Sequence, residues 1–258
     1  MPTNPDSRPI VSLRELDLDR HLADPALRQL YVTPMFDLIA PRYDEFTRLF
    51  SFGMDRGWKA TLLARAEIAI VRGGVVADVA TGTGDLAYGL ARLRPDLRIV
   101  GLDVSGRMLA LARRRGPEDA ATGVSVSGGD LSALPLPAST LDAVTAGYAL
   151  RNTPDWRASV EELARVIRPG GHLLTLDFYR PVSGLWRRVF LGWLSVAGGA
   201  VGWWWHREPM AYGYIARSIE QFTTAPGFER ALEASGFRLA ATHLHLGGGI
   251  ALHHAIRR

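Results

Sequence analysis

Short apolar runs alternate with helix-like stretches along most of this chain. Aliphatic and β-branched runs of a few residues predict strands, and apolar residues three or four positions apart predict helices. The predicted strands are residues 75–80, 97–102, 124–127, 141–148, 172–178, 237–246 and 250–256, and the predicted helices are residues 55–71, 85–93, 105–115, 155–167 and 228–235. Strands separated by helices of about 10 to 15 residues favour a doubly wound α/β sheet with parallel strands. The glycines at 247–249 join the last two strands as a hairpin, so the sheet should end antiparallel.

The N-terminal part follows a different pattern. Residues 1–33 are polar and irregular, and we expect them to form an arm that ends at the Thr33–Pro34 step. Apolar positions from Phe36 to Phe50 have helical spacing despite Pro41. The sequence therefore predicts a main domain over residues 34–258.

One long apolar stretch interrupts the alternation. Residues 189–205 read VFLGWLSVAGGAVGWWW without a charge and follow Arg187 and Arg188. A membrane-spanning helix needs about 20 apolar residues, and the glycines weaken this one, so we expect a buried or interfacial helix. Trp203–Trp205 suit a membrane interface or an apolar ligand pocket, and a packed core helix is equally compatible. We treat residues 181–214 as an apolar insertion that covers the substrate.

Composition and charge exclude several classes of protein. The 258 residues include no cysteine, which excludes disulfides, thiolate-bound metals and a cysteine nucleophile. A net charge of +4, with arginine scattered among acidic residues, argues against nucleic-acid binding. Arg113–Arg115 is interpreted as a solvated helix end. The N-terminus mixes both charges, unlike a signal peptide, so we expect a cytoplasmic protein.

Candidate binding residues follow the first three predicted strands. Asp78–Asp85 reads DVATGTGD between a strand and a helix, where glycines allow a tight turn and close approach to a ligand. Asp103 ends the second strand and can accept hydrogen bonds from a ribose diol. Asp130, after the third strand, can meet an adenine. Together these positions predict an adenosine-type cofactor across the strand tips.

Two cofactors compete for this site. The spacing Gly82-x-Gly84-x-x-Ala87 satisfies a loose dinucleotide fingerprint, which is weak evidence alone. A short-chain dehydrogenase would need a tyrosine four residues before a lysine, but the only lysine is Lys59 and position 55 is Asp. Asp78 before the glycines instead suits a cofactor with an ammonium group. S-adenosylmethionine carries an ammonium and a sulfonium that donates methyl, and it has no pyrophosphate.

At these residues the chain resembles the ubiquinone/menaquinone biosynthesis C-methyltransferases. The resemblance covers roughly residues 33–258. It is carried by FDLIAPRYDEFTRLFSFGMDRGWK (36–59), DVATGTGD (78–85), GLDVSGRML (101–109), ALPLP (133–137), YALRNTPD (148–155), RVIRPGG (165–171), AYGYIARSI (211–219) and GGGIALH (247–253). The glycine loop marks any class I methyltransferase, whereas the 36–59 and 148–155 segments are more specific.

The resemblance implies a class I methyltransferase fold, Rossmann-like, with a seven-stranded, mostly parallel sheet and an antiparallel C-terminal hairpin. It also implies S-adenosylmethionine as cofactor and a demethylated prenyl quinol, methylated on ring carbon, as substrate. The residues that it assigns to the cofactor are Tyr43 as a cap, Asp78, Ala80, Thr81, Gly82, Thr83 and Gly84 for the methionine part, Asp103 and Val104 for the ribose, Asp130 and Leu131 for the adenine, and Gly147 near the fourth strand.

Ring-carbon methylation places a physical demand on the protein. The carbon beside a phenolic oxygen is nucleophilic mainly as the phenolate, so deprotonation and positioning must help. We assign this polar role to Arg151 and Asn152; the guanidinium can favour phenolate but is too basic to be an ordinary general base. The competing interpretation is that Arg151 pairs with a carboxylate and only holds its loop. His206, beside the tryptophans, is a candidate base.

The remaining histidines are more simply structural. His253 falls where the family also carries histidine. His243, His245 and His254 lie on the predicted hairpin, and without cysteines or a matching carboxylate pattern no metal site is expected.

Residues 181–210 depart from the family pattern, and this leaves the substrate open. A C- or O-methyltransferase of a soluble aromatic or polyketide-like phenol is one alternative, and a non-catalytic quinone or lipid carrier is another. The expected partners are a small aromatic or quinol substrate and, through residues 189–205, the surface of a membrane at its inner face; a homodimer is compatible with the sequence.

Overall fold

The fold is described here from a computed structural model, which covers residues 17–51, 53–118, 123–206 and 209–258. The side chains of residues 23, 46, 50, 117–118, 200–206 and 209–213 are outside this description. His206 and Trp203–Trp205, for which the sequence suggested roles, are therefore placed by their backbone alone.

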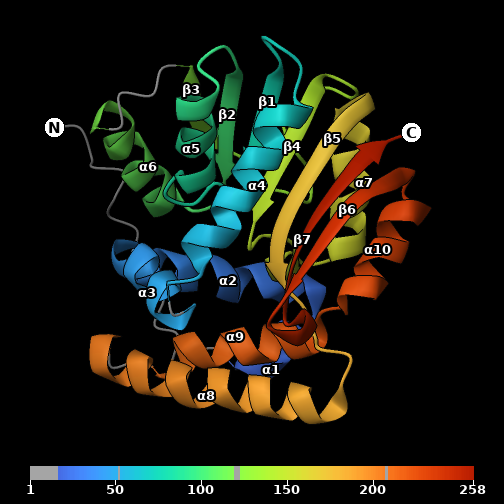
Figure 1. Cartoon of the computed structure of the whole chain (residues 1–258). Helices are drawn as coiled ribbons and strands as arrows, with labels where there is room; N and C mark the ends of the chain where they lie inside the picture. Colours follow the sequence, from blue (N-terminus) through green and yellow to red (C-terminus); the bar gives the residue numbers. More distant parts are fainter. Residues whose placement is uncertain (1–16, 52, 119–122, 207–208) are drawn as a thin grey trace, which may run out of the picture.

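A twisted seven-stranded sheet forms the centre of the molecule (Figure 1). Its strands are β1 (Val75–Val79), β2 (Arg98–Asp103), β3 (Val124–Gly128), β4 (Leu141–Gly147), β5 (Ile167–Phe178), β6 (Phe237–His245) and β7 (Ile250–Arg257). The order is β3-β2-β1-β4-β5-β7-β6, with the first five strands parallel and β7 antiparallel to both neighbours. This confirms the predicted α/β class and the antiparallel C-terminal hairpin.

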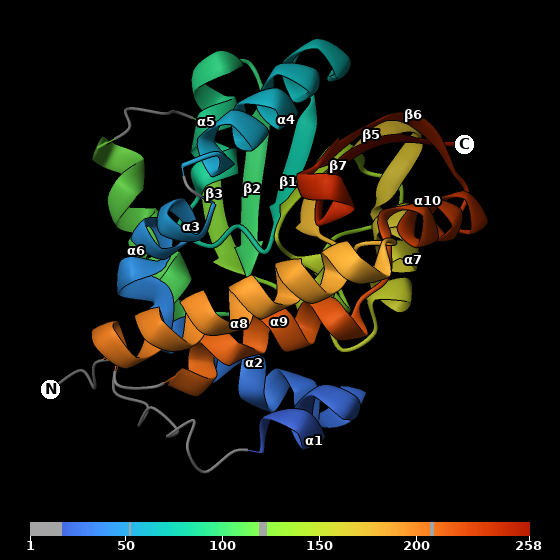
Figure 2. The ribbon, with the colours of Figure 1, turned by 60° about the horizontal axis from the view of Figure 1, so that its bottom comes forward.

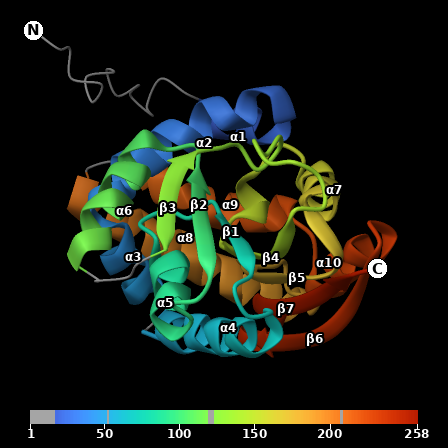
Figure 3. The same ribbon diagram turned by 90° about the horizontal axis from the view of Figure 1, so that it is seen from above.

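Helices cover both faces of the sheet (Figure 3). On one face, α4 (Asp55–Ala69) and α5 (Asp85–Leu93) pack on the strands through Leu62 and Leu90, and α6 (Gly106–Glu118) lies beside α5. On the other face, α7 (Trp156–Val166) and α10 (Ala225–Ala234) pack through Leu163 and Phe228. Each face thus has its own apolar core, as expected for a sheet buried on both sides.

A layer of helices crosses the end of the sheet where the parallel strands finish (Figures 1 and 2). It contains α1 (Leu18–Ala23), α2 (Pro25–Ile39), α3 (Tyr43–Phe50), α8 (Gly184–His206) and α9 (Pro209–Gln221), with a short 3-10 turn at Ala40–Arg42. A third apolar core joins α2 to α8 and α9 through Tyr31, Leu194 and Tyr214. The apolar insertion and the N-terminal helices thus form one cover over the strand tips.

The N-terminal prediction was wrong for residues 18–33. Residues 18–23 and 25–33 are helical, and α2 runs through Thr33 and Pro34 without a break. Pro34 has no N–H to donate to the carbonyl of Leu30, so α2 lacks one of its hydrogen bonds there. The predicted 36–50 helix is instead divided at Pro41, where α2 gives way to the 3-10 turn and α3.

The apolar stretch at 189–205 is helical, as predicted. Within α8, Phe190 and Leu194 are buried, whereas several other apolar side chains are exposed. Among the helices that the structure describes, none is long and apolar enough to cross a bilayer.

Candidate active site

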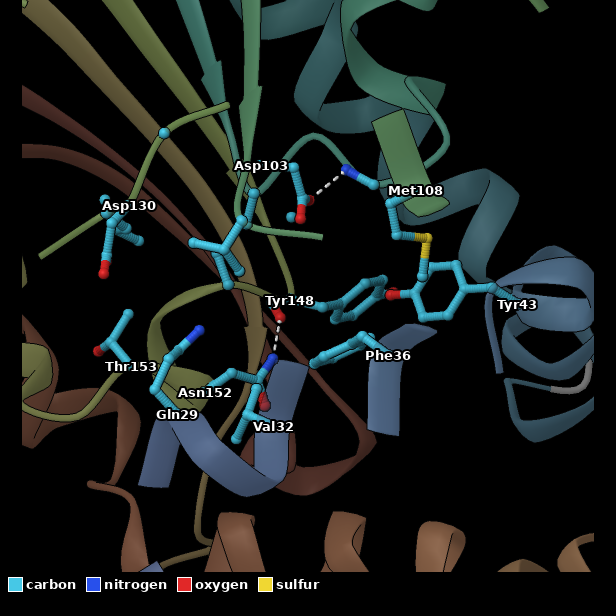
Figure 4. A pocket seen from close by; sticks show the side chains of 17 residues that line it. Gln29, Val32, Phe36, Tyr43, Asp103, Met108, Asp130, Tyr148, Asn152 and Thr153 are labelled. Atoms are coloured by element: carbon cyan, nitrogen blue, oxygen red, sulfur yellow. Dashed lines mark hydrogen bonds between the residues drawn. The ribbon is translucent and has the colours of Figure 1, made fainter. Parts of the chain in front are cut away.

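A cavity lies between the carboxyl ends of β1, β2 and β4 and the helix α2. Its walls come from these strand ends and from α2, α3 and α6. Figure 4 shows Tyr43 and Phe36 beside the ring of Tyr148, with Asp130 at the opposite end. The carboxyl ends of parallel strands are where open α/β sheets bind ligands.

The backbone after β1 turns in the left-handed conformation. Ala80, Gly82 and Gly84 have φ angles of 49°, 57° and 87°. A Cβ at Gly84 would also lie 2.5 Å from the ring of Tyr88. This position therefore requires glycine for two reasons, its positive φ and the lack of space for a side chain. The turn brings the backbone of Ala80 and Gly82 to the cavity and starts α5 immediately behind it.

Asp78 is a buried carboxylate beneath this turn. Its two oxygens accept hydrogen bonds from the hydroxyls of Thr81 and Thr145, both at 2.6 Å. Burial raises the pKa of Asp78 to about 6, although these hydroxyls oppose the shift. With Thr81 and Thr83, Asp78 lines a second cavity, which shares Tyr43 and Gly82 with the first.

Asp103 fixes the glycine loop and faces the cavity at the end of β2. One carboxylate oxygen accepts the backbone N–H of Gly82 at 2.8 Å, and the other accepts that of Ser105 at 2.8 Å (Figure 4 shows the former). Burial raises the pKa of Asp103, whereas these amide hydrogen bonds lower it. Val104 and Asp103 both line the cavity.

The loop after β3 supplies the far end of the cavity. Asp130 and Leu131 both line it, and Leu131 is buried. One oxygen of Asp130 accepts the backbone N–H of Ser132 at 2.8 Å, which fixes the carboxylate at the loop. Met108 of α6 also lines the cavity and lies on the side of Tyr43 (Figure 4).

A network of charged side chains borders the second cavity. The Lys59 ammonium lies 2.9 Å from Asp55 and 2.8 Å from Asp85, and the Tyr148 hydroxyl donates to Asp55 at 2.6 Å. Asp85 also pairs with Arg115. Burial works against the charge on Lys59, but Asp85 and Asp55 raise its pKa, so the ammonium stays protonated.

Tyr43 closes the cavities from α3. Burial raises its pKa to about 12, although the nearby cations Lys59 and Arg151 lower it, so its hydroxyl remains a neutral donor. Arg115 contacts Asp44, the next residue, at 3.7 Å, and the Thr83 hydroxyl donates to Asp44 at 2.9 Å. The position of α3 is thereby tied to the glycine loop.

The turn after β4 is strained and heavily bonded. Tyr148 has a φ of 56°, which is costly for a bulky residue and is held here by surrounding contacts. The Asn152 amide donates to the Tyr148 carbonyl at 2.7 Å (Figure 4), and the Tyr214 hydroxyl of α9 donates to the Asn152 oxygen at 2.8 Å. Asn152 lines the cavity together with Gly147.

Arg151 is buried one residue away and does not line the cavity. Its guanidinium pairs with the buried carboxylate of Asp177 at 2.6 Å and also donates to the Tyr148 carbonyl at 3.2 Å. The Nε atom of Arg151 is buried without a hydrogen-bond partner among the described residues. The ion pair with a carboxylate is the contact that the loop-holding interpretation expected.

The structure brings most of the predicted cofactor residues to the two cavities. These are Tyr43, Asp78, Ala80, Thr81, Gly82, Thr83, Asp103, Val104, Asp130, Leu131 and Gly147. Gly84 lies behind the loop as the cap of α5 and lines neither cavity. The side chain of His206 is outside the described residues.

The sequence interpretation missed the wall that α2 contributes. Gln29, Val32 and Phe36 of this helix line the first cavity. Asp24 caps α2 and Pro25 begins it, which is a helix-start signal that could have revealed the element. Lys59 also borders the second cavity, a position that the sequence interpretation did not give it.

The histidines of the hairpin lie away from the cavities. His253 is buried against the rings of Tyr179 and Phe228. His254 lies 3.0 Å from His172, nitrogen to nitrogen. Within the described part of the chain, no group of three or more metal-binding side chains could hold an ion.

The charges around the cavities fit S-adenosylmethionine. Four carboxylates, those of Asp78, Asp85, Asp103 and Asp130, and one ammonium, that of Lys59, are the charged groups in the described lining. A net negative lining attracts a donor that carries an ammonium and a sulfonium, and it repels the pyrophosphate of a dinucleotide. The same net negative charge disfavours a nicotinamide dinucleotide as the cofactor.

The strand order, the glycine turn and the carboxylates after β1 and β2 define a class I S-adenosylmethionine-dependent methyltransferase. Solved structures with this fold include an S-adenosylmethionine-dependent methyltransferase from Aquifex aeolicus, with a TM-score of 0.56 and 18% identity over 85% of this chain and 97% of that one. The [4+2]-cyclase SpnF matches with a TM-score of 0.65 and 19% identity, over 88% and 95% of the two chains. At such identities the likeness concerns the fold.

The chain belongs to the ubiE/COQ5 methyltransferase family, whose sequence model matches residues 25–257. It is 38% identical to the ubiquinone/menaquinone biosynthesis C-methyltransferase UbiE of Syntrophotalea carbinolica, over 84% of this chain and 90% of that one. It is 37% identical to the demethylmenaquinone methyltransferase of Deinococcus radiodurans, over 80% and 85% of the two chains. The predicted family, enzyme class and cofactor are thus confirmed.

Proposed function

We propose that this enzyme transfers the methyl group of S-adenosylmethionine to a ring carbon of a demethylated quinol with a prenyl tail. The relatives named as ubiquinone/menaquinone and demethylmenaquinone methyltransferases support this choice of substrate. The observation that carries the proposal is one cavity with carboxylates at the strand tips and an apolar, aromatic wall on α2 and the turn after β4. A cationic donor and a flat aromatic acceptor can therefore meet there.

The donor occupies the strand side of the cavities. Asp78 and Thr83 hold the methionine part, Asp103 accepts from the ribose hydroxyls, and Asp130 with Leu131 borders the adenine. When bound, S-adenosylmethionine supplies an activated methyl group on a sulfonium. Tyr43, as a neutral hydroxyl on the ordered helix α3, caps this part of the site.

The quinol ring occupies the space between Phe36, Tyr148 and Asn152. Apolar side chains there exclude water, which strengthens the nucleophilicity of a desolvated phenolate. The Asn152 side chain is held by hydrogen bonds at both ends, so it presents a fixed polar group to the ring. Positioning of this kind can supply a large part of the rate enhancement.

Arg151 acts on the reaction through its charge and through the turn that it holds. Its buried guanidinium lies 5.9 Å from the centre of the Tyr148 ring, close enough to favour a phenolate in the cavity. Asp177 neutralises part of this charge and keeps the arginine in place. His206 remains our candidate for removing the ring proton.

The test is methyl transfer from labelled S-adenosylmethionine to a demethylmenaquinol with a shortened tail, with the product carbon or oxygen assigned by NMR. We expect label on a ring carbon. Label on oxygen, or transfer to a soluble naphthol without a tail at an equal kcat/KM, would contradict the proposed substrate. A chain that does not bind the donor would favour the carrier alternative.

The prenyl tail leaves the cavity on the side of the helical cover. The wall formed by Val32 and Phe36 belongs to the same apolar core as Leu194 and Tyr214 of α8 and α9. We place the tail along this apolar layer and assign α8 to peripheral contact with the lipid surface from which the quinol comes.

A further inference from the structure

Helix α8 has apolar residues on two separate faces. Phe190 and Leu194 are buried against α9 and α2. A second set, which we name the outer stripe, is exposed: Leu185 by 71%, Val189 by 52%, Trp193 by 47% and Val196 by 73%. Spacings of four, four and three residues align these side chains along one side of the helix.

The outer stripe faces away from the rest of the molecule. In Figure 1, α8 is the lowest helix of the cover, farther from the sheet than α9 and α2. Trp186 anchors the start of α8 because its indole N–H donates to the Leu246 carbonyl at 2.7 Å. A helix fixed in this way presents its stripe on a rigid support.

A groove with cationic walls runs between α8 and α9 beside the stripe. We name it the arginine groove; its lining includes Arg187, Arg188, Arg217 and Glu220. Arg187 and Arg188 have no ion-pair partner among the described residues, whereas Arg217 lies 3.4 Å from Asp19 and 3.7 Å from Glu220. The groove therefore has two arginines free to bind an anion.

Small residues keep the groove open. Gly192 and Ser195 of α8 and Ala216 of α9 line its floor and walls. A Cβ added at Gly192 would meet nothing within 4 Å, so there is free space around this position. Arg188 precedes Val189 and lies about 100° from it around the helix axis, so the cationic groove borders the stripe.

We propose that the arginine groove binds the phosphate of an anionic phospholipid while the outer stripe enters the interfacial region of the bilayer. The proposal rests on the proposed function, since it concerns the surface from which the quinol is taken. An apolar stripe bordered by a cationic groove is the pattern of helices that lie in a membrane interface. Guanidinium groups bind phosphate through paired hydrogen bonds, which favours Arg187 and Arg188 as the headgroup contacts.

The position of the arginine groove relates the proposed membrane contact to the substrate cavity. The cover of α2, α8 and α9 lies over the strand tips where the cavity opens, so the bilayer meets the molecule at its substrate end. A second copy of the chain would also cover the stripe, but a like copy would bring the same arginines toward one another. Charge complementarity thus favours an anionic lipid surface.

The experiment is cosedimentation of the full chain with vesicles of phosphatidylcholine alone and of phosphatidylcholine with phosphatidylglycerol. We expect binding to the anionic vesicles to be at least about tenfold tighter, because each arginine near an anionic surface adds about fivefold to the partition coefficient. Arg187→Glu with Arg188→Glu should remove this preference. Arg72→Glu with Arg230→Glu, the same charge change at exposed sites on other elements, should retain it.

A Val189→Ser and Val196→Ser variant separates the apolar contribution, and we expect weaker binding to both kinds of vesicle. Donor affinity and the unfolding midpoint serve as checks that each variant is folded. Equal binding of wild type to both vesicles, or full retention by the Arg187/Arg188 variant, would overturn the proposal. Calorimetric binding of inorganic phosphate without retention on anionic vesicles would overturn it too, as would a dimer that dissociates in the Val189/Val196 variant.

Methyl transfer to the short-tailed quinol without vesicles reports on the proposed function separately. If that reaction succeeds and vesicle binding fails, only the lipid site is wrong. If vesicle binding succeeds and transfer fails, the substrate assignment is wrong instead.

Discussion

Asp103 serves two roles, because it holds the glycine loop and faces the donor. We expect Asp103→Ala to weaken binding of S-adenosylmethionine by at least about tenfold, since hydrogen bonds to a charged group contribute about 1.5–3 kcal/mol. Asp103→Asn keeps one acceptor oxygen for a loop amide, so we expect it to weaken donor binding less than Asp103→Ala does. Titration calorimetry measures both, with the exposed Glu161→Ala as the matched carboxylate control; unchanged affinity in Asp103→Ala would contradict the assignment.

Asp78 should make donor binding depend on pH. Its pKa of about 6 means that the carboxylate is charged above this pH and becomes neutral below it. A neutral Asp78 no longer attracts an ammonium group, so affinity for S-adenosylmethionine should fall as the pH drops from about 7 to 5. The Asp78→Asn variant should bind S-adenosylmethionine more weakly at every pH, and its affinity should not fall between pH 7 and 5. The same pH dependence of affinity in both proteins would show that another group is responsible.

The location of a site residue could be predicted from the sequence where its position along a strand determines it. Asp78, Asp103 and Asp130 follow or end consecutive parallel strands, so their meeting at one edge follows from the topology. Arg151 was not predictable in the same way. Its carboxylate partner, Asp177, is 26 residues away on the neighbouring strand β5, and no local pattern marks a buried ion pair of that kind.

At the scale of elements, α9 is coupled to the turn after β4 by one hydrogen bond, from Tyr214 to Asn152. Tyr214→Phe removes the donor and leaves the buried Asn152 oxygen without it. We expect kcat to fall several-fold and the free energy of unfolding to fall by about 1–2 kcal/mol, with donor affinity unchanged. Initial rates with the short-tailed quinol and calorimetric donor titration test this.

A purely structural Tyr214 would lower stability without a change in kcat for the folded fraction. The control is Tyr179→Phe, which changes another fully buried tyrosine in a different core and should spare kcat.

The C-terminal hairpin should weaken in acid through His253. Burial lowers the pKa of His253 from 6.5 to about 4, even though Glu229 lies 3.6 Å away. The unfolded chain therefore takes up a proton first as pH falls, and stability decreases between pH 6.5 and 4, by about 2 kcal/mol at pH 5. Urea unfolding at pH 7 and 5 measures the change, and His253→Phe should show about 2 kcal/mol less pH dependence.

Helix α2 shows why some elements escape sequence interpretation. Its buried side chains, among them Tyr31, Met35 and Ile39, have helical spacing, but the polar residues before them and Pro34 suggested a boundary. A proline inside a helix is tolerated where the carbonyl that it leaves unbonded can reach water. Leu30 is 58% exposed, so this turn of α2 lies on the solvent side, and exposure is a property of the packed structure.

At the scale of the molecule, the helical cover has its own apolar core, distinct from the two that flank the sheet. We expect the cover to open locally at a lower free energy than the sheet does. Addition of S-adenosylmethionine should then slow amide hydrogen exchange in α2, which lines the cavity, more than in β6. Hydrogen exchange read by mass spectrometry tests this, and equal protection of both segments would contradict it.

The order of the sheet was predictable only in part. Alternating strands and helices indicate parallel neighbours, and glycines at 247–249 indicate a hairpin. Neither pattern tells which hairpin strand will join β5. That choice follows from long-range packing, in which Ala251 and Ala255 of β7 join the same core as Leu173 of β5.

The insertion of β7 between β5 and β6 affects how the protein is made. The ribosome releases β6 before β7, yet β6 has no neighbour in the sheet until β7 has emerged. During that interval the edge of β5 is also open, and an open strand edge can pair with another chain. Chaperone capture should therefore be strongest after β5 has emerged and before β7 pairs with it.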